Sequence, residues 1–423
     1  MEVRKGYKQT EIGIIPEDWS SITLEEVTTR LVRGPFGGAL KKAFFVERGY
    51  KVYEQRNAIY ETTEIGNYYI DLIKYKELER FRVQSGDFIV SCAGTIGRIF
   101  QIPKEAPEGV INQALLKISI NSETIKESFF LTNFKSQSFQ ERIKENSHGG
   151  AMQNLVGMDV FRKTLFFLPP TLAEQEAIAE ALSDADALIE SLETLLTKKR
   201  QVKQGAMQEL LTGKRRLAGF SDEWKEKRLG NSATLKARIG WQGLTTAEYL
   251  DSGDYYLITG TEFKDGFIDW KNCHYVTEAR YKQDKNIQVR EHDVLVTKDG
   301  TIGKIALITN LTKPATLNSG VFVIRPIDNM FYPEFFYYLL CSSVFIEFLD
   351  QLSAGSTINH LYQKDFVNFV YKTPPTIAEQ TAIAEILSDM DAEITTLEEK
   401  LVKARQVKQG MMSELLTGRI RLV

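Results

Sequence analysis

The segment PPTLAEQ at residues 169–175 returns as PPTIAEQ at residues 374–380, about 205 positions further along the chain. From these two segments onward, roughly 34 of 49 aligned positions are identical, which establishes an internal repeat within the 423 residues. The sequences in front of the two copies share only scattered landmarks. The repeat therefore predicts two closely similar connectors and two divergent globular heads.

Each connector is predicted to be one long helix with a defined start and end. Thr171 with Glu174, and Thr376 with Glu379, fit the capping box, in which the hydroxyl accepts from an orphan amide and the glutamate reaches back to the cap. A glycine follows each helix where a left-handed residue would close it, at Gly213 and Gly418. Some 41 helical residues would make a rod of roughly 60 Å.

Apolar residues recur along both connectors in alternating steps of four and three, which is the spacing of a coiled-coil seam. The seam positions are Ile178, Leu182, Ala185, Ile189, Leu192 and Leu196, repeated as Ile383, Leu387, Met390, Ile394, Leu397 and Leu401. If a pseudo-twofold axis relates the two halves and lies perpendicular to the rods, the helices run antiparallel. We therefore expect an antiparallel coiled coil.

The polar face of the connectors is repeated as well. Residues 200–205 read RQVKQG, and residues 405–410 have the same sequence. Because a seam needs only its apolar positions, one interpretation is a repeated partner-binding surface; the alternative is a recent duplication without such a surface. The partner-binding candidates are Arg200, Gln201, Lys203, Arg405, Gln406 and Lys408.

The heads show short strand-like stretches broken by turns, with a few helical segments, so the predicted fold class is α+β with a curved mixed sheet. The sequence divides into head 1 (residues 1–168), a first helical spacer (169–217), head 2 (218–373) and a second helical spacer (374–423). Two globular domains with connectors suit a chain of this length. The apolar stretch at 335–349 is too short to span a bilayer and predicts a buried helix.

Composition limits the classes of partner. The net charge is −3 with 26% charged and 43% hydrophobic residues, and the two heads carry about +2 and −2, so any DNA-binding surface is expected to be a local patch. The three cysteines are scattered without metal-ligand spacing, which suits a reducing compartment. No targeting segment opens the sequence, and a cytoplasmic protein without membrane contact is expected.

The sharpest motif inside each head is Gly-Thr-Ile-Gly followed by a cation. It occurs at residues 94–98 and again at 300–304. Such a turn can hold a phosphate through backbone amides and the basic side chain; the alternative is a tight hairpin turn with an exposed cation. The candidate DNA-binding residues are Thr95 and Arg98 in head 1 and Lys298, Thr301 and Lys304 in head 2.

A second candidate lies early in each head, where glycines, cations and an aromatic residue suit a loop that enters a DNA groove. A plain solvated loop is the alternative. The candidates are Arg33, Gly34, Lys41 and Lys42 in head 1 and Lys236, Arg238, Trp241 and Gln242 in head 2. Arg56 and Asn57 are similar candidates on the next strand-like stretch.

Catalytic signatures are missing. No Ser-His-Asp or Cys-His arrangement, metal cluster, Walker A sequence or amino-methyltransferase motif is readable. We therefore expect a non-catalytic chain without a metal or cofactor of its own.

The order of head, Pro-Pro-Thr-x-Ala-Glu-Gln, and a long helix ending Glu-Leu-Leu-Thr-Gly, twice over, resembles the DNA-specificity (S, HsdS) subunits of type I restriction-modification systems. The resemblance covers essentially the whole chain. It implies target-recognition domains that each read one half of a bipartite, asymmetric site in double-stranded DNA, held apart by the coiled coil.

The same resemblance implies partners. They are two methyltransferase (M) subunits and the restriction (R) subunits, and S-adenosylmethionine, ATP and magnesium would belong to those partners. The near-neutral heads leave a competing interpretation, a non-catalytic scaffold with two protein-binding heads; an enzyme with a novel site has little support.

Overall fold

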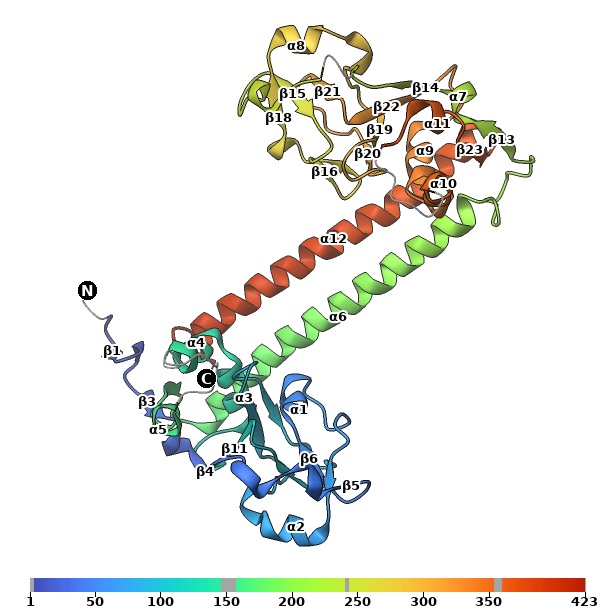
Figure 1. Cartoon of the computed structure of the whole chain (residues 1–423). Helices are drawn as coiled ribbons and strands as arrows, with labels where there is room; N and C mark the ends of the chain where they lie inside the picture. The colour runs from blue at the N-terminus through green and yellow to red at the C-terminus, as the bar shows by residue number, and fades with distance from the viewer. Residues whose placement is uncertain (1–3, 146–156, 240–242, 354–359, 423) are drawn as a thin grey trace. The chain divides into compact units, whose positions relative to one another are not determined.

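A computed structural model describes residues 4–145, 157–239, 243–353 and 360–422. The chain forms two compact units, one of residues 1–192 and 400–423 and the other of residues 193–399. Each unit contains one head together with one half of each long helix. The predicted mixture of helix and sheet is confirmed in both heads (Figure 1).

Head 1 is built on two four-stranded sheets. One has the order β4-β11-β8-β9 and the other β10-β6-β7-β5, with β12 and β3 pairing separately, as do β1 and β2. The strands are β1 Tyr7–Thr10, β2 Gly13–Pro16, β3 Ser20–Thr23, β4 Thr28–Arg33, β5 Phe45–Val46, β6 Tyr50–Tyr53, β7 Tyr69–Ile70, β8 Phe88–Ser91, β9 Ile99–Gln101, β10 Gly109–Ile111, β11 Leu115–Ile120 and β12 Leu165–Leu168. Short helices flank them: α1 Gln55–Ile59, α2 Leu72–Glu77, α3 Glu127–Lys135, α4 Gln137–Glu145 and α5 Met158–Arg162.

Head 2 repeats the first of these sheets and part of the second, which has three strands here (β18-β15-β21), with different sequences. The order β14-β22-β19-β20 matches β4-β11-β8-β9, and β15 pairs with β21 in parallel as β6 pairs with β10. The strands are β13 Lys225–Arg228, β14 Ala233–Lys236, β15 Tyr255–Ile258, β16 Phe263–Lys264, β17 Phe267–Ile268, β18 His274–Val276, β19 Val294–Thr297, β20 Ile305–Leu307, β21 Ala315–Leu317, β22 Val321–Pro326 and β23 Val370–Thr373. The helices are α7 Leu229–Ser232, α8 Glu278–Lys282, α9 Pro333–Leu340, α10 Ser343–Ser353 and α11 Gln363–Phe366.

The long helices are α6, Leu172–Leu210, and α12, Ile377–Leu415, each of 39 residues. Gly213 and Gly418 follow them with φ of 71° and 69°, so the predicted left-handed closing residues are confirmed. The threonine half of each capping box is also present, because Thr171 Oγ1 and Thr376 Oγ1 accept from the amides three residues later at 3.1 and 3.3 Å.

The two helices pack antiparallel in each unit (Figure 1). Lys199 pairs with Glu393 at 2.6 Å and Arg200 with Glu398 at 2.5 Å, while Lys408 at the other end of α12 pairs with Asp186. Most predicted seam positions are buried: Ile178, Leu182, Leu196, Ile383, Leu387, Ile394, Leu397 and Leu401. Ala185, Ile189, Leu192 and Met390 are half-buried.

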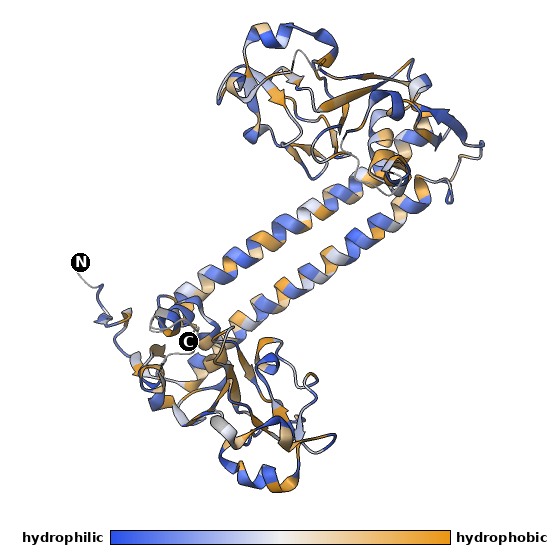
Figure 2. Ribbon diagram, viewed as in Figure 1, coloured by the Kyte–Doolittle hydropathy of each residue, from blue (hydrophilic) through white to orange (hydrophobic). Residues whose placement is uncertain are grey.

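The start of each long helix belongs to a head core rather than to the seam alone. Ile178 and Leu182 pack in the main core of head 1 beside Leu415 and Leu416 at the end of α12. In the other unit, Ile383 and Leu387 pack with Leu211 in the same way. Figure 2 shows the corresponding pattern, with hydrophobic residues concentrated on the strands of the heads and interrupted along the helices by hydrophilic ones. Burial of these apolar side chains ties each helix end to its head.

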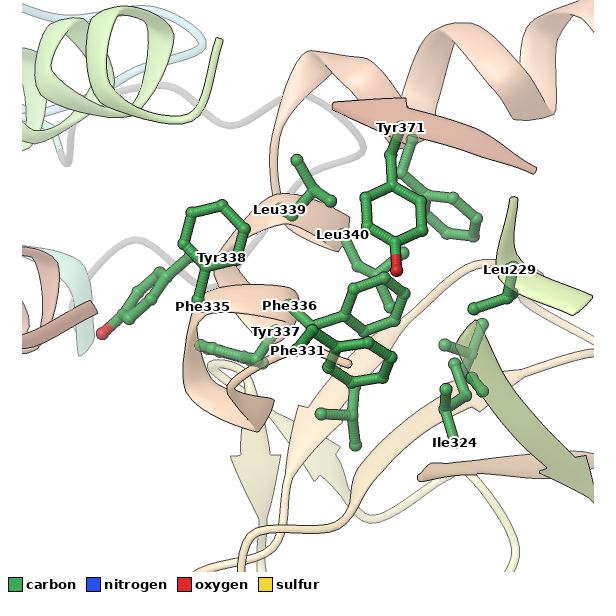
Figure 3. Close-up of a cluster of buried hydrophobic side chains, with 14 of the residues drawn as sticks. Leu229, Ile324, Phe331, Phe335, Phe336, Tyr337, Tyr338, Leu339, Leu340 and Tyr371 are labelled. Atoms are coloured by element: carbon green, nitrogen blue, oxygen red, sulfur yellow. The ribbon is translucent and has the colours of Figure 1, made fainter. Parts of the chain in front are cut away.

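The apolar stretch at 335–349 is not the single buried helix that the sequence predicts. It is divided between α9 and α10, which bend by 53° at a break near Cys341. Phe336 on α9 packs against Phe331 and Tyr371, with ring centroids 4.3 and 5.3 Å apart (Figure 3). Among the described residues, no single helix has the length and apolarity needed to cross a membrane; the α9–α10 pair meets both criteria by length and composition only.

Candidate nucleic-acid interface

Three loops meet at one edge of each head. In head 2 they follow β15, β19 and β21: Asn318 N donates to Ile258 O at 2.8 Å, and Lys298 N donates to Gly320 O at 2.8 Å. In head 1 the equivalent loops follow β6, β8 and β10, where Asn112 N donates to Tyr53 O at 2.9 Å and Cys92 N donates to Ala114 O at 2.8 Å. Because these loops end rigid strands, the heads hold them in place while leaving their sequences free to differ.

The Gly-Thr-Ile-Gly segments belong to these edges and form tight hairpin turns. Their glycines have φ between 65° and 80°, a region that favours glycine. The backbone amides of Gly97 and Arg98 donate to Ser91 O and Oγ at 2.9 Å, and those of Gly303 and Lys304 donate to Thr297 in the same way. Those amides are therefore not available to a phosphate. The side chains of Thr95, Arg98, Thr301 and Lys304 are exposed, and Lys298 is half-buried.

The early loop of head 1 lies against the same edge. Gly34 N donates to Leu115 O at 2.9 Å, and a Cβ on Gly34 would lie 1.8 Å from Asn112 O, so only glycine fits there. Arg33 is half-buried at the end of β4, with its guanidinium 5.9 Å from the centre of the Phe36 ring. Lys41 and Lys42 are exposed on the following loop. The structure thus places Gly34, which is itself buried, against the loop after β10 rather than at the surface.

The corresponding loop of head 2 places Arg238 inside the protein. Its side chain is 1% exposed, with Nε donating to Leu317 O at 2.8 Å, Nη1 to Gln283 Oε1 at 3.1 Å and Nη2 to Thr316 Oγ1 at 3.2 Å. Burial lowers its pKa from the usual arginine value. Arg238 has no surface with which to contact DNA, contrary to the sequence-based expectation. Lys236 is exposed, whereas Trp241 and Gln242 lie outside the described residues.

Asn57 is also an internal residue, although the sequence made it a DNA-binding candidate. It is fully buried; its Oδ1 accepts from Glu54 N at 2.8 Å, and its Nδ2 donates to Thr62 O and Ile65 O at 2.9 and 3.0 Å. Both polar atoms of its side chain therefore hydrogen-bond to the backbone and stabilise the loop after β6. Arg56 beside it is exposed on the surface.

Several further polar side chains at these edges were not among the residues predicted from the sequence. In head 1, Gln55 is half-buried, with Nε2 3.5 Å from Thr95 O, and Gln113 is exposed. In head 2 the loops border a hollow of about 700 Å³. Its lining residues are Thr246, Tyr249, Asp251, Thr259, Thr261, His274, Asp299, Asn318, Ser319 and Gly320. A signal in the sequence existed for Thr259, Asp299 and Asn318, which closely follow the apolar strands β15, β19 and β21.

The repeated polar face of the connectors is used partly within the helix pair. Lys203 pairs with Asp391, which also accepts from Tyr338 Oη at 2.8 Å. Lys408 pairs with Asp186, and Arg200 with Glu398. These contacts give three of the repeat's cations, Arg200, Lys203 and Lys408, partners within the helix pair. Gln201, Gln406 and Arg405 are exposed.

The repeat also connects each head to the start of a long helix, which the sequence did not indicate. We call this connection the joint. Glu379 is buried and bound by Arg216, and Glu174 is buried and bound by Arg421, which also binds Asp18. The glutamates therefore bind arginines instead of reaching back to the cap. The hydrogen bond from Arg421 lowers the pKa of Asp18 below its usual range.

The glutamine of the same motif completes the joint. Gln175 Oε1 accepts from Lys126 N at 2.8 Å, and its Nε2 donates to Thr124 O and Pro169 O at 3.2 and 3.3 Å. In the second copy, Gln380 Oε1 accepts from Tyr332 N at 2.8 Å. Both glutamines are buried and connect the long helix to the segment that leads into α3 or α9.

Metal and thiol chemistry receive no support from the geometry. Across residues 4–145, 157–239, 243–353 and 360–422, no group of three or more His, Cys, Asp or Glu side chains is placed to hold a metal ion. Cys92 and Cys273 are buried free thiols, and burial raises the pKa of each to about 12. Neither is activated as a nucleophile.

Comparison with known proteins accounts for both halves of the chain. A family model described as type I restriction modification DNA specificity domain matches residues 16–203 and 221–404. The type I restriction enzyme MjaVIII specificity subunit of Methanocaldococcus jannaschii is 24% identical over 432 residues, covering 96% of this chain and 94% of that relative.

Solved structures show the same fold. The type I restriction-modification S subunit from M. genitalium aligns with a TM-score of 0.57 and 16% identity, covering 98% of both chains. The HsdS subunit from Thermoanaerobacter tengcongensis aligns with a TM-score of 0.51 and 16% identity, covering 96% of this chain and 98% of that one.

Proposed function

The chain belongs to the family of type I restriction-modification DNA-specificity subunits, and from this premise we propose that each head reads one half of a bipartite, asymmetric DNA site. Subunits of this family are non-catalytic and recognise DNA. We propose further that the helix pair sets the spacing of the half-sites and docks two methyltransferase subunits. The restriction subunits would join that complex.

The observation that carries the proposal is that one topology is repeated with different loop residues. The strand order at the loop-bearing edge is the same in both heads, yet the loop after β8 contains Ala93 where the loop after β19 contains Asp299. Matching strand orders with different side chains at the loops suit two readers of different base sequences. An asymmetric target follows from this difference.

The spacing role is supported by the joints and by helix length. The buried glutamate and glutamine of each repeat fasten a head to the start of a long helix, so that a head does not swing freely on its connector. A helix of 39 residues is about 58 Å long, which exceeds the roughly 34 to 36 Å of one DNA turn. Two readers mounted on such helices would suit half-sites about one turn apart.

The docking role is supported by what the helix pair leaves exposed. Gln201 and Gln406 are exposed in equivalent positions, and beside them Val202 and Val407 are 51% and 53% exposed. Equivalent exposed surfaces on the two helices suit two copies of one partner. S-adenosylmethionine, ATP and magnesium would be bound by the methyltransferase and restriction subunits.

The charge of the heads sets the expected binding behaviour. Because head 1 and head 2 carry only about +2 and −2, methyltransferase subunits would supply much of the phosphate contact. This chain alone should bind DNA weakly, and the assembled complex should bind tightly.

Mapping of methylated adenines in cells that co-express the chain with its methyltransferase tests the proposal. The expected result is one bipartite motif with two dissimilar halves separated by a constant spacer. A palindromic motif, or the absence of site-specific methylation by an assembled complex, would refute it and favour the scaffold interpretation.

A further inference from the structure

Equivalent edges of the two heads carry different hydrogen-bonding groups. After β6 and β10, head 1 presents amide and guanidinium groups; after β15 and β21, head 2 presents hydroxyl groups. The residues are Gln55, Arg56 and Gln113 in head 1 and Thr259, Thr261 and Ser319 in head 2. After β19, head 2 adds the carboxylate of Asp299 at the position of Ala93 in head 1. Among these side chains, Arg56 is the one that can only donate and Asp299 the one that, when ionised, can only accept.

The carboxylate of Asp299 borders the hollow of about 700 Å³ in head 2. Apolar and polar surface both line this hollow, and its polar groups are hydroxyl, carboxylate, amide and imidazole groups. Its lining residues, within the part of the chain that the structure describes, include no lysine or arginine. A hollow of this composition favours ligand groups that donate hydrogen bonds and disfavours a phosphate, which would be repelled by the Asp299 and Asp251 carboxylates.

The Asp299 side chain is held in place at this edge. His360 Nδ1 contacts its Oδ1, and the segment after His360 is fixed because Leu361 N donates to Lys298 O at 2.9 Å. The other carboxylate oxygen, Oδ2, lies 3.9 Å from the point that a Cβ on Gly320 would occupy. Since Gly320 has no side chain, this oxygen is not covered from that side. The Asp299 side chain remains 43% exposed.

The base edges of DNA offer few groups that match such an acceptor. In the major groove the exocyclic amino groups, N4 of cytosine and N6 of adenine, are the donors, and Asp or Glu accepts from cytosine N4. Lys304 lies exposed on the same turn and is available for a neighbouring phosphate. Attraction between Lys304 and that phosphate would offset the repulsion between the Asp299 carboxylate and the DNA backbone.

Building on the proposed function, we propose that Asp299 is a specificity-determining residue of head 2, accepting a hydrogen bond from the exocyclic amino group of one base in its half-site. Ala93 at the equivalent position of head 1 has no acceptor side chain. The two half-sites would therefore be read by chemically different contacts at this position.

The test uses the full chain assembled with its methyltransferase subunits. Methylation mapping first gives the wild-type motif and the position at which Asp299→Ala relaxes it. Binding is then measured on duplexes in which the amino group at that position is removed, with 2-pyrimidinone replacing cytosine or purine replacing adenine. Asp254→Ala, which alters an exposed carboxylate of the same head outside the hollow, is the matched control.

The expected result is that removal of the amino group weakens wild-type and Asp254→Ala complexes roughly tenfold and leaves the Asp299→Ala complex unchanged. The identity of the sensitive duplex distinguishes cytosine from adenine. An unaltered motif for Asp299→Ala, or equal weakening of all three complexes, overturns the inference while the proposed function stands. Absence of site-specific methylation by the wild-type complex overturns both.

Discussion

Arg216 binds Glu379 through two hydrogen bonds, from Nε to Oε1 at 2.8 Å and from Nη2 to Oε2 at 2.9 Å, and the glutamate side chain is only 1% exposed. The pair joins the segment after α6 to the start of α12, and Trp224 Nε1 lies 3.4 Å from the same carboxylate. A buried carboxylate needs such a partner, because an unpaired buried charge is strongly destabilising.

We expect Arg216→Ala to lower the stability of the unit formed by residues 193–399 by about 3 kcal/mol, since it leaves Glu379 buried without its cation. Urea unfolding monitored by fluorescence measures the change. Arg215→Ala is the control, because its pairing with Glu209 is exposed and should contribute less than about 0.5 kcal/mol. Equal effects of the two variants would show that the joint does not depend on the Arg216–Glu379 pair.

Arg238→Ala is expected to destabilise head 2 by about 3 kcal/mol, because it removes hydrogen bonds from a charged donor to Leu317 O, Gln283 and Thr316. Thermal unfolding checks this effect. Lys236→Ala alters an exposed residue of the same region and should change stability by less than about 0.5 kcal/mol. A stable Arg238→Ala protein with weakened DNA binding would instead assign Arg238 a direct DNA contact.

Arg98→Ala and Lys304→Ala should each weaken DNA binding by the assembled complex without changing the recognised bases. Both side chains are cationic and exposed, so we expect them to contact phosphates. The backbone amides of these two residues are bonded within the turns and are not expected to contribute. Each substitution should reduce the slope of log affinity against log salt by about 1. An unchanged slope with an altered motif would show base recognition instead.

Gln201→Glu combined with Gln406→Glu should weaken methyltransferase binding about tenfold while leaving the thermal midpoint unchanged, because both side chains are exposed outside the interhelical ion pairs. Isothermal titration with the purified methyltransferase measures the affinity. Gln208→Glu, at another exposed position of α6, is the control. Unaltered affinity in the double variant would remove these positions from the docking surface.

The fold was predictable where neighbouring residues decide it. Heptad spacing locates the seam, and threonine and glycine mark the helix ends, because these signals act within one or two turns of the chain. The partner of Glu379 lies 163 residues away, and that of Glu174 lies 247 residues away. Local patterns contain no information about such pairings, so the arginines that close the joints were missed.

The candidate site was predictable only as regions. The Gly-Thr-Ile-Gly turns lie at the loop-bearing edges, but a polar residue in a loop looks the same in sequence whether it faces water or the interior. Asn57 and Arg238 are therefore indistinguishable from surface residues until their backbone partners are known. Asp299 could not be selected from the sequence, because its contact with His360 and its place beside the hollow arise only in the folded protein.

In the proposed function, the helix pair sets the distance between two independent readers. The most direct test of this role inserts one heptad into each long helix, after Leu192 in α6 and after Glu399 in α12, where the two compact units divide. Seven residues add about 10 Å with little rotation of the helix face, which corresponds to about three base pairs. We expect a methylation motif with both halves unchanged and a spacer about three base pairs longer. An unchanged spacer in an active complex would contradict the proposed role of the helix pair.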